Sequence, residues 1–287
     1  MKDLLRRDMA PIVDGAWKEI ELQSSRILKG NLSGRKLVDF SGPHGWQFAA
    51  VNLGRLEVGR EEGQDGVTWG MHKVLPLVEV RVPFTLGIWE LDDVVRGAKN
   101  PDLDAVKEAA RKVAMFEETA IYHGFGAGGI QGMLELSSHP PVALSPDRSR
   151  LTESLELALL AIQGAEIGGP YALVLGTEPY KWLMAGDPSA YPLRKRIGAM
   201  FSGGIHWSPV LEGGAVLSLR GGDFELTVGQ DLAIGYKIHD SRNVELYFTE
   251  SFTFRVLEPA AAIELRRQNA LGQADASAES THPRPDA

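Results

Sequence analysis

The residues best suited to chemistry lie where an apolar extended run, residues 81–89, gives way to an acidic segment. Trp89 follows Arg81 by eight positions and precedes the carboxylates of Glu90, Asp92 and Asp93. An aromatic ring, a guanidinium and carboxylates at a strand end are groups from which small-ligand sites are often built. This junction is therefore the first candidate for a ligand site, and the acidic segment is expected to be a turn.

No other pattern predicts catalysis or metal binding. The chain has no cysteine, which excludes disulfides, thiolate zinc sites and cysteine nucleophiles. Its seven histidines are scattered, and no two have the spacing that lets one helix present two metal ligands. The motifs of serine hydrolases, P-loop proteins, zinc peptidases and EF-hands are missing. The sequence therefore predicts a protein without catalytic residues.

Two patterns only imitate functional sites. Residues 124–129, GFGAGG, match the glycine spacing of dinucleotide-binding loops, but a helix is predicted before them where that fold requires a strand. The adjacent acids Glu117 and Glu118 could be imagined as an acid–base pair, but neighbouring residues of a helix point apart. We interpret the glycine run as a helix end and predict no catalytic pair.

Composition restricts the class of protein. With 287 residues and 44% hydrophobic content, the chain can bury a sizeable core. A net charge of -8 argues against a dedicated nucleic-acid-binding protein, which needs clustered Lys and Arg. No stretch approaches the roughly 20 apolar residues that cross a bilayer, and no standard export signal is visible. We therefore expect a cytoplasmic protein that binds neither membrane nor nucleic acid.

The order of the predicted elements is unusual. The patterns indicate an amphipathic helix from Asp14 to about Gly30, a long polar-tipped hairpin at 48–75 and a long helix that begins at Pro101. Alternating helices and strands follow, and antiparallel strands occupy the chain after Gly214. The hairpin has little core of its own, so it is expected to pack against another element or another subunit.

This order, together with several sequence words, resembles the encapsulins, family 1 nanocompartment shell proteins once described as linocin-like bacteriocins. The matching words are RRDMAPI, GRKLVDFSGPHGWQFAA, VPFTLGIWELDDVVRG, GPYALVLG, YPLRKRI, RGGDFELTVGQDLAIGY and TESFTFRVLEPAAAI. They run from about residue 6 to residue 263, and the tail after Arg267 looks longer than the family needs.

The resemblance implies an α+β fold, that of the tailed-bacteriophage major capsid protein. Its peripheral domain would comprise 1–47, 76–130 and 224–267, its extended loop 48–75 and its axial domain 131–223. A flexible tail, 268–287, would follow, because its composition is too polar to order itself.

The resemblance also implies a function. Many copies of the chain would form a closed icosahedral shell around a cargo enzyme, in this family most often a ferritin-like ferroxidase for iron storage or a dye-decolorizing peroxidase. The shell itself would not be an enzyme, and the cargo would carry a C-terminal targeting peptide. Two alternatives stay open: a prophage capsid protein that encloses DNA, and a secreted bacteriocin or peptidase. The net charge opposes the first, and the missing export signal and nucleophile oppose the second.

For cargo binding, the resemblance implies a groove between the N-terminal helix and the peripheral domain. The residues expected to contact the peptide are Arg35, Asp39, Asp231, Leu232 and Ile234. The apolar residues would supply pockets, and the charged residues would hold the peptide backbone or its polar ends. The structural alternative is that Arg35 and Asp39 pair with each other and that Ile234 belongs to the core.

For the pore and a cofactor, the resemblance implies two further sites. Asp187, Pro188 and Ser189 would line the five-fold pore, where a ring of aspartates would attract cations. No cofactor is required, but some encapsulins with a tryptophan in the same context bind a flavin on it. FMN or riboflavin would stack on Trp89, with Arg81 as the nearby cation. The alternative is an interface or core tryptophan, with Arg81 paired to one of the acids.

Overall fold

The computed structural model of the chain describes residues 4–59, 67–184 and 191–267. The chain forms two compact units. The first comprises Met1–Leu136, Ser208–Val210 and Leu219–Pro259, and the second comprises Ser137–Trp207, Leu211–Ser218 and Ala260–Ala287. The mixture of helices and sheets in the described residues confirms the predicted α+β class.

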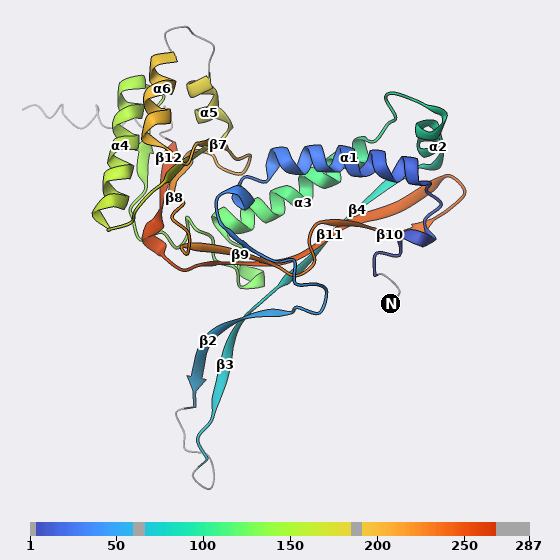
Figure 1. The fold of residues 1–287 in the computed structure, drawn as a ribbon, viewed down its shortest axis with the longest axis horizontal. Helices are drawn as coiled ribbons and strands as arrows, with labels where there is room; N and C mark the ends of the chain where they lie inside the picture. Colours follow the sequence, from blue (N-terminus) through green and yellow to red (C-terminus); the bar gives the residue numbers. More distant parts are fainter. Residues whose placement is uncertain (1–3, 60–66, 185–190, 268–287) are drawn as a thin grey trace, which may run out of the picture. The chain divides into compact units, whose positions relative to one another are not determined.

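A five-stranded sheet with helices packed on it forms the first unit (Figure 1). The strand order is β1-β9-β11-β10, and β4 also pairs with β11. Strands β1 and β9 are parallel, whereas the other pairs are antiparallel. The strands are β1 (Asp39–Ser41), β4 (Val78–Gly87), β9 (Phe224–Val228), β10 (Ala233–His239) and β11 (Asn243–Val256). The helices are α1 (Asp14–Asn31), α2 (Ile88–Arg96) and α3 (Asp104–His123), with short 3-10 turns η1 (Arg7–Met9), η2 (Gly34–Lys36) and η4 (Gly126–Gly128).

The core of this unit lies where α1 and α3 pack together and onto the long strands. Val106, Ala110 and Val113 recur at helical spacing along α3 and are fully buried. They belong to one apolar cluster with Ala16 and Ile20 of α1 and with residues of β4, β10 and β11. Each fully buried valine or isoleucine side chain of this cluster stabilises the fold by about 1.5–3 kcal/mol. This packing fixes the position of α1 above the sheet.

The acidic segment after Trp89 is a helix, so the predicted turn is wrong. Gly87 precedes α2, and Gly97 ends it in the left-handed conformation, φ 96°, where glycine is favoured. Leu91 is the one buried residue of α2. Since α2 is short and its buried surface is small, periodicity alone did not reveal it.

The predicted hairpin is present as β2 (Ala50–Val58) and β3 (Gly70–Pro76), which pair antiparallel with each other (Figure 1). Within the described residues, neither strand pairs with any other strand. Leu56, Val58 and Met71 are more than half exposed, whereas only Val51 is buried. Exposed apolar side chains on an isolated hairpin indicate a surface that another chain covers.

Helices and a second five-stranded sheet form the second unit, with strand order β5-β12-β8-β6-β7. The strands are β5 (Val142–Leu144), β6 (Tyr171–Leu175), β7 (Ile205–Trp207), β8 (Gly214–Ser218) and β12 (Ala262–Arg267). The helices are α4 (Arg148–Gly164), α5 (Thr177–Met184) and α6 (Tyr191–Met200), and the 3-10 turn η6 (Pro259–Ala261) precedes β12.

The unit boundaries differ from the predicted domains at the end of the chain. We expected the peripheral domain to extend to residue 267, but β12 pairs with β5 and β8 of the second sheet. The predicted pore residues Asp187, Pro188 and Ser189 and the predicted tail lie outside the described residues. Among the helices that are described, none has the length and apolar composition required to span a membrane.

Removing the hairpin should separate folding from assembly. Val51 and Leu75 are partners in the β2–β3 ladder, so a two-residue Asn-Gly turn can join them in place of residues 52–74. Because the described residues of this segment bury little apolar surface, we expect a folded protein with the far-UV circular dichroism of the wild type. We expect no shells by negative-stain microscopy. Closed particles of wild-type size from this variant would show that the hairpin is not an assembly element.

Candidate functional site

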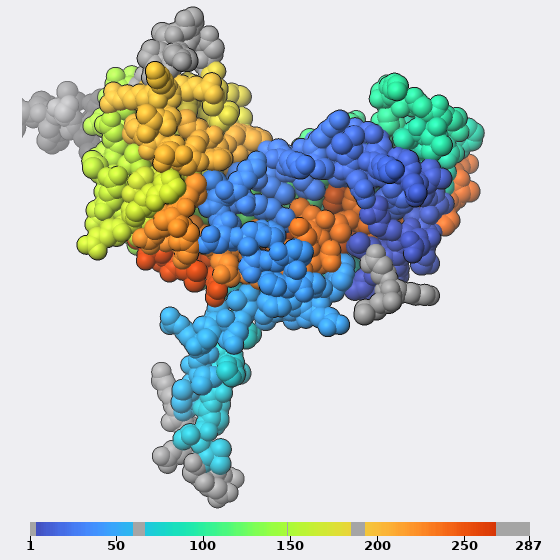
Figure 2. Space-filling view, in the orientation of Figure 1, coloured from blue at the N-terminus to red at the C-terminus, as the bar shows by residue number. Residues whose placement is uncertain are grey.

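A groove of about 580 Å³ lies in the first unit, between α1 and the start of β10. Its apolar surface comes from Leu28 and Leu32 of the N-terminal segment and from Leu232, Ile234 and Phe248 of the strand region. In Figure 2, orange atoms of the later strands are visible beside the blue atoms of the N-terminal helix. A mostly apolar concave surface of this size is typical of a ligand site.

Polar and charged side chains surround the apolar surface. Arg7 pairs with Glu21 at 2.6 Å, and both line the groove. Lys29 and Lys36, both exposed, line it near the end of α1, and Lys36 Nζ donates to the carbonyl of Lys29 at 3.1 Å. The groove therefore combines apolar pockets with charged groups that can orient an extended ligand.

The structure brings four of the five predicted cargo residues to this groove. Arg35, Asp231, Leu232 and Ile234 all line it. Asp39 does not, because its carboxylate accepts a hydrogen bond of 2.6 Å from the backbone N–H of Gly222. The structural alternative is half right. Arg35 and Asp39 do not pair, because Arg35 binds other carboxylates, but Ile234 does belong to the apolar core cluster of the unit.

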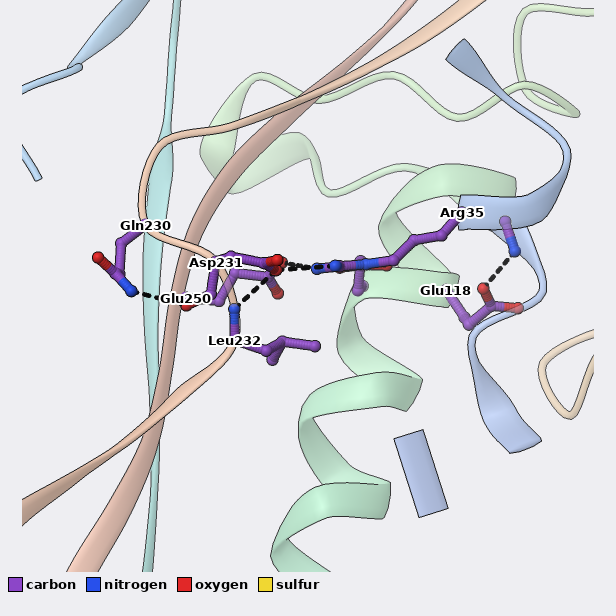
Figure 3. Close-up of polar contacts among 8 residues, drawn as sticks. Arg35, Glu118, Gln230, Asp231, Leu232 and Glu250 are labelled. Atoms are coloured by element: carbon purple, nitrogen blue, oxygen red, sulfur yellow. Dashed lines mark hydrogen bonds and ion pairs between the residues drawn. The ribbon is translucent and has the colours of Figure 1, made fainter. Parts of the chain in front are cut away.

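Arg35 forms the centre of a buried ion-pair network. Its guanidinium donates to Glu117 at 2.6 to 2.9 Å, to Asp231 at 2.8 Å and to Glu250. Figure 3 shows Arg35 pointing toward Asp231 and Glu250. The side chains of Glu117 and Glu250 are fully buried, whereas that of Asp231 is 41% exposed. The planar fork of donors lets one arginine serve carboxylates from three different segments.

Burial and charge determine the protonation of this network. Burial raises the pKa of Glu250 well above its ordinary value, and the negative charge of Glu117 raises it further. Burial alone would lower the pKa of Arg35, but its hydrogen bond to Glu117 and the three carboxylate charges raise it. Arg35 is therefore charged at any physiological pH. Removing it would leave buried carboxylates without a partner, a change that typically costs about 3–5 kcal/mol.

Glu118, the neighbour of Glu117 on α3, forms a second buried set of hydrogen bonds beside the Arg35 network. Its carboxylate accepts hydrogen bonds from the Ser33 hydroxyl at 2.5 Å, the Gly34 N–H at 2.6 Å and the Ser208 hydroxyl at 2.9 Å. Burial raises the pKa of Glu118 to about 7, although the three hydrogen bonds oppose this shift. A Cβ at Gly34 would lie 2.7 Å from Cδ1 of Ile121, so any larger residue there would force the Ile121 side chain to shift.

Two consecutive acids of α3 thus hold three consecutive residues after α1. Glu118 binds Ser33 and Gly34, and Glu117 binds Arg35. The sequence pattern suggested these acids only as a catalytic pair and did not reveal that they anchor the segment after α1. The available signal was their position in the apolar pattern of α3, because carboxylates predicted on a buried face need partners.

The structure does not bring Arg81 and Trp89 together. Arg81 pairs with Glu79 at 2.7 Å and lies 5.1 Å from the ring centroid of Tyr247, so its predicted pairing with a later acid is wrong. The seven residues from Arg81 to Gly87 are extended, and the six steps between them span about 20 Å.

Trp89 is exposed, so its interpretation as a core residue is wrong. Its side chain is 73% exposed at the start of α2. Arg96, one end of an ion pair with Asp93, has its guanidinium 6.0 Å from the Trp89 ring centroid. An exposed aromatic ring with an arginine over it offers a surface for stacking and a nearby positive charge.

Comparison with known proteins gives the family. The family model described as an encapsulating protein for peroxidase matches residues 1–253. The chain belongs to the encapsulin shell-protein family. A type 1 encapsulin shell protein from Rhodospirillum rubrum is 45% identical over 272 residues, which cover 93% of this chain and 97% of that protein. Another from Mycobacterium tuberculosis is 40% identical over 261 residues, which cover 91% of this chain and 98% of that protein.

Family membership confirms the predicted class of function. The relatives are named as shell proteins, so the role of the family is structural, not enzymatic, and its members act as many copies in a closed shell. The resemblance found in the sequence words is thus confirmed.

Solved structures confirm the capsid fold. A virus-like particle from Pyrococcus furiosus has a TM-score of 0.62 at 17% identity and covers 88% of this chain and 100% of its own. The capsid of Myoviridae phage XM1 has a TM-score of 0.52 at 15% identity, with 83% and 92% covered. At such low identity these likenesses show the fold alone.

Titration of Glu118 should make stability depend on pH. Its pKa is about 7 in the folded protein and 4.5 ordinarily, so its stabilising protonated form is fully available below pH 4.5 and is lost as pH rises through 7. The shift corresponds to about 3 kcal/mol. Glu118→Gln is neutral at every pH, so its melting temperature should fall less than that of the wild type between pH 5 and pH 8.

Differential scanning fluorimetry of purified shells measures this difference. Glu108→Gln is the matched control, because Glu108 is an exposed acid of the same helix, paired with Lys112. It should reproduce the wild-type pH profile. Parallel profiles for Glu118→Gln and the wild type would mean that Glu118 is ionised throughout this range.

Proposed function

We propose that this chain encloses a cargo protein and holds it by a C-terminal targeting peptide docked in the groove between α1 and β10. The observation that carries the proposal is the groove itself, an apolar surface with charged borders in a chain of the encapsulin family. A flexible peptide rich in Leu, Ile and Gly needs such shallow apolar pockets and a few polar groups that fix its register.

The dimensions of the groove suit a short extended segment. Glu21 and Lys29, which both line it, are eight residues apart on α1, or about 12 Å along the helix. An extended peptide covers that distance with roughly four residues. Each peptide would bind weakly, but several copies on one multimeric cargo raise the effective concentration inside a shell.

For the cargo, we propose a dye-decolorizing peroxidase. The support is the family description, which names encapsulation of peroxidase. A ferritin-like ferroxidase is the alternative, and sequencing of protein co-purified from the native host would distinguish them. The cytoplasmic location of the shell and its lack of nucleic-acid and membrane partners remain predictions.

The comparisons do not favour the two alternatives, a prophage capsid protein and a secreted bacteriocin or peptidase. A prophage capsid shares the fold, but the relatives at 40–45% identity are named as encapsulin shell proteins. None of these names describes a bacteriocin or a peptidase. Purified particles with the absorbance of packaged DNA would revive the capsid alternative.

We also propose that Trp89 binds a flavin, FMN or riboflavin, as the sequence resemblance implies. The exposure of the ring fits a stacking platform. Arg96, rather than the predicted Arg81, is the cation near the ring. A bound flavin would supply electron-transfer chemistry at the shell, and the chain would contribute the stacking surface and the positive charge.

The docking site is tested by charging the groove. Leu232→Asp places a carboxylate against the apolar surface and should lower loading of a co-expressed tagged cargo at least tenfold, while shells still form. Ile238→Asp is the matched control, because Ile238 lies on β10, the strand that Leu232 directly precedes, is 58% exposed and does not line the groove. Loading is measured as cargo per shell subunit by densitometry. Normal loading of Leu232→Asp shells would show that the cargo peptide docks at another site.

The flavin site is tested by the colour of purified shells. Wild-type shells from flavin-replete cells should show visible flavin absorption, and Trp89→Ala shells should lose it while still assembling. Val95→Ala removes another exposed apolar residue of α2 and should keep the colour. Colourless wild-type shells would refute flavin binding.

A further inference from the structure

Strand β10 forms an edge of the first sheet. In the order β1-β9-β11-β10 it has a neighbouring strand, β11, on one side only. The register pairs Ile234 with Phe248 and Tyr236 with Leu246, and the ladder is regular from residue 233 to residue 236. The other side of β10 therefore presents backbone donors and acceptors that no strand of the described chain uses.

One backbone group on that side has a partner. Tyr236 donates its N–H to the carbonyl of Leu5 at 2.8 Å, so this N–H points away from β11. In an antiparallel strand the N–H and C=O groups of every second residue point to the same side. The backbone groups of Ile234 therefore point to the free edge as well. Within residues 4–59, 67–184 and 191–267, no backbone group pairs with the Ile234 N–H outside the sheet ladder.

The free edge at Ile234 coincides with the groove. Leu232, Ala233 and Ile234 all line it, and Phe248, the cross-strand partner of Ile234, lines it too. Ile234 itself is only 5% exposed. A backbone N–H in such a buried place is costly to leave unpaired. The occupant that suits the groove is thus one that brings backbone hydrogen-bonding groups together with apolar side chains.

We infer that the cargo peptide docks as an added strand on β10, with its backbone paired to the N–H and C=O of Ile234. This inference rests on the proposed function and specifies how the peptide is recognised. Alternate side chains of an added strand point to the same face, so every second residue of the peptide contacts Leu28, Leu232 and Phe248. Leu5 already occupies the edge at Tyr236, so the peptide cannot slide along β10 in that direction.

Backbone ester substitution tests the pairing without changing any side chain. The probe is a fluorescein-labelled synthetic peptide of about eight residues in which Leu or Ile alternates with Gly or Ser. Each amide N–H is replaced in turn by an ester oxygen, and shells are opened and reclosed with each peptide. Loss of one paired N–H should lower the retained peptide about fivefold at one or two alternate positions. Esters at the intervening positions should change retention less than twofold.

The matching change in the shell is Ile234→Pro. Proline removes the N–H that faces the free edge and leaves the bonds to β11 in place, so it is tolerated on an edge strand. We expect peptide retention to fall about fivefold, whereas Ile234→Val, which keeps the N–H, should retain peptide like the wild type. If Ile234→Pro does not assemble, the ester series decides alone.

The outcomes separate this inference from the proposed function. An alternating ester profile supports strand addition. A flat ester profile with good retention of the unmodified peptide overturns strand addition and leaves groove docking intact. Failure of wild-type shells to retain the unmodified peptide, together with normal cargo loading by Leu232→Asp shells, overturns both.

Discussion

The guanidinium of Arg35 is the interaction on which the first unit depends. It joins the segment after α1 to Glu117 of α3, to Glu250 of β11 and to Asp231 before β10. Two of these carboxylates are fully buried, so loss of the arginine would destabilise the fold by about 3–5 kcal/mol. Since the same arginine lines the groove, the network that orders the fold also sets the distance between the two walls of the groove.

Several surfaces of the subunit are incomplete by themselves. The β2–β3 hairpin exposes apolar side chains on both strands, and among the described residues no strand pairs with the edge of β10 at Ile234. An isolated monomer normally avoids such features because they promote association. In a shell protein such surfaces are useful, because they are available for contacts with neighbouring copies. We propose that cargo completes the groove.

The capsid fold is shared by a virus-like particle and a phage capsid, and a fold by itself does not determine what a particle encloses. Charge and local surface carry that information. A net charge of -8 is unfavourable for packing polyanionic DNA, whereas an apolar groove with charged borders is favourable for a peptide.

Sequence by itself determined the long elements and the family. The helix stripes of α1 and α3 and the hairpin were legible because their periodicity extends over many residues, and the ordered sequence words identified the encapsulins. It also placed Leu232 and Ile234 in the groove region, because those words carry the family resemblance. Only the tertiary structure decided which charges meet. Arg35 finds Glu117, Asp231 and Glu250 across 82, 196 and 215 positions, and no local pattern encodes contacts at such separations. Asp39 likewise accepts its hydrogen bond from the backbone N–H of Gly222, 183 positions away. Arg81 differs, because its partner Glu79 is a local neighbour on the same strand that the prediction overlooked.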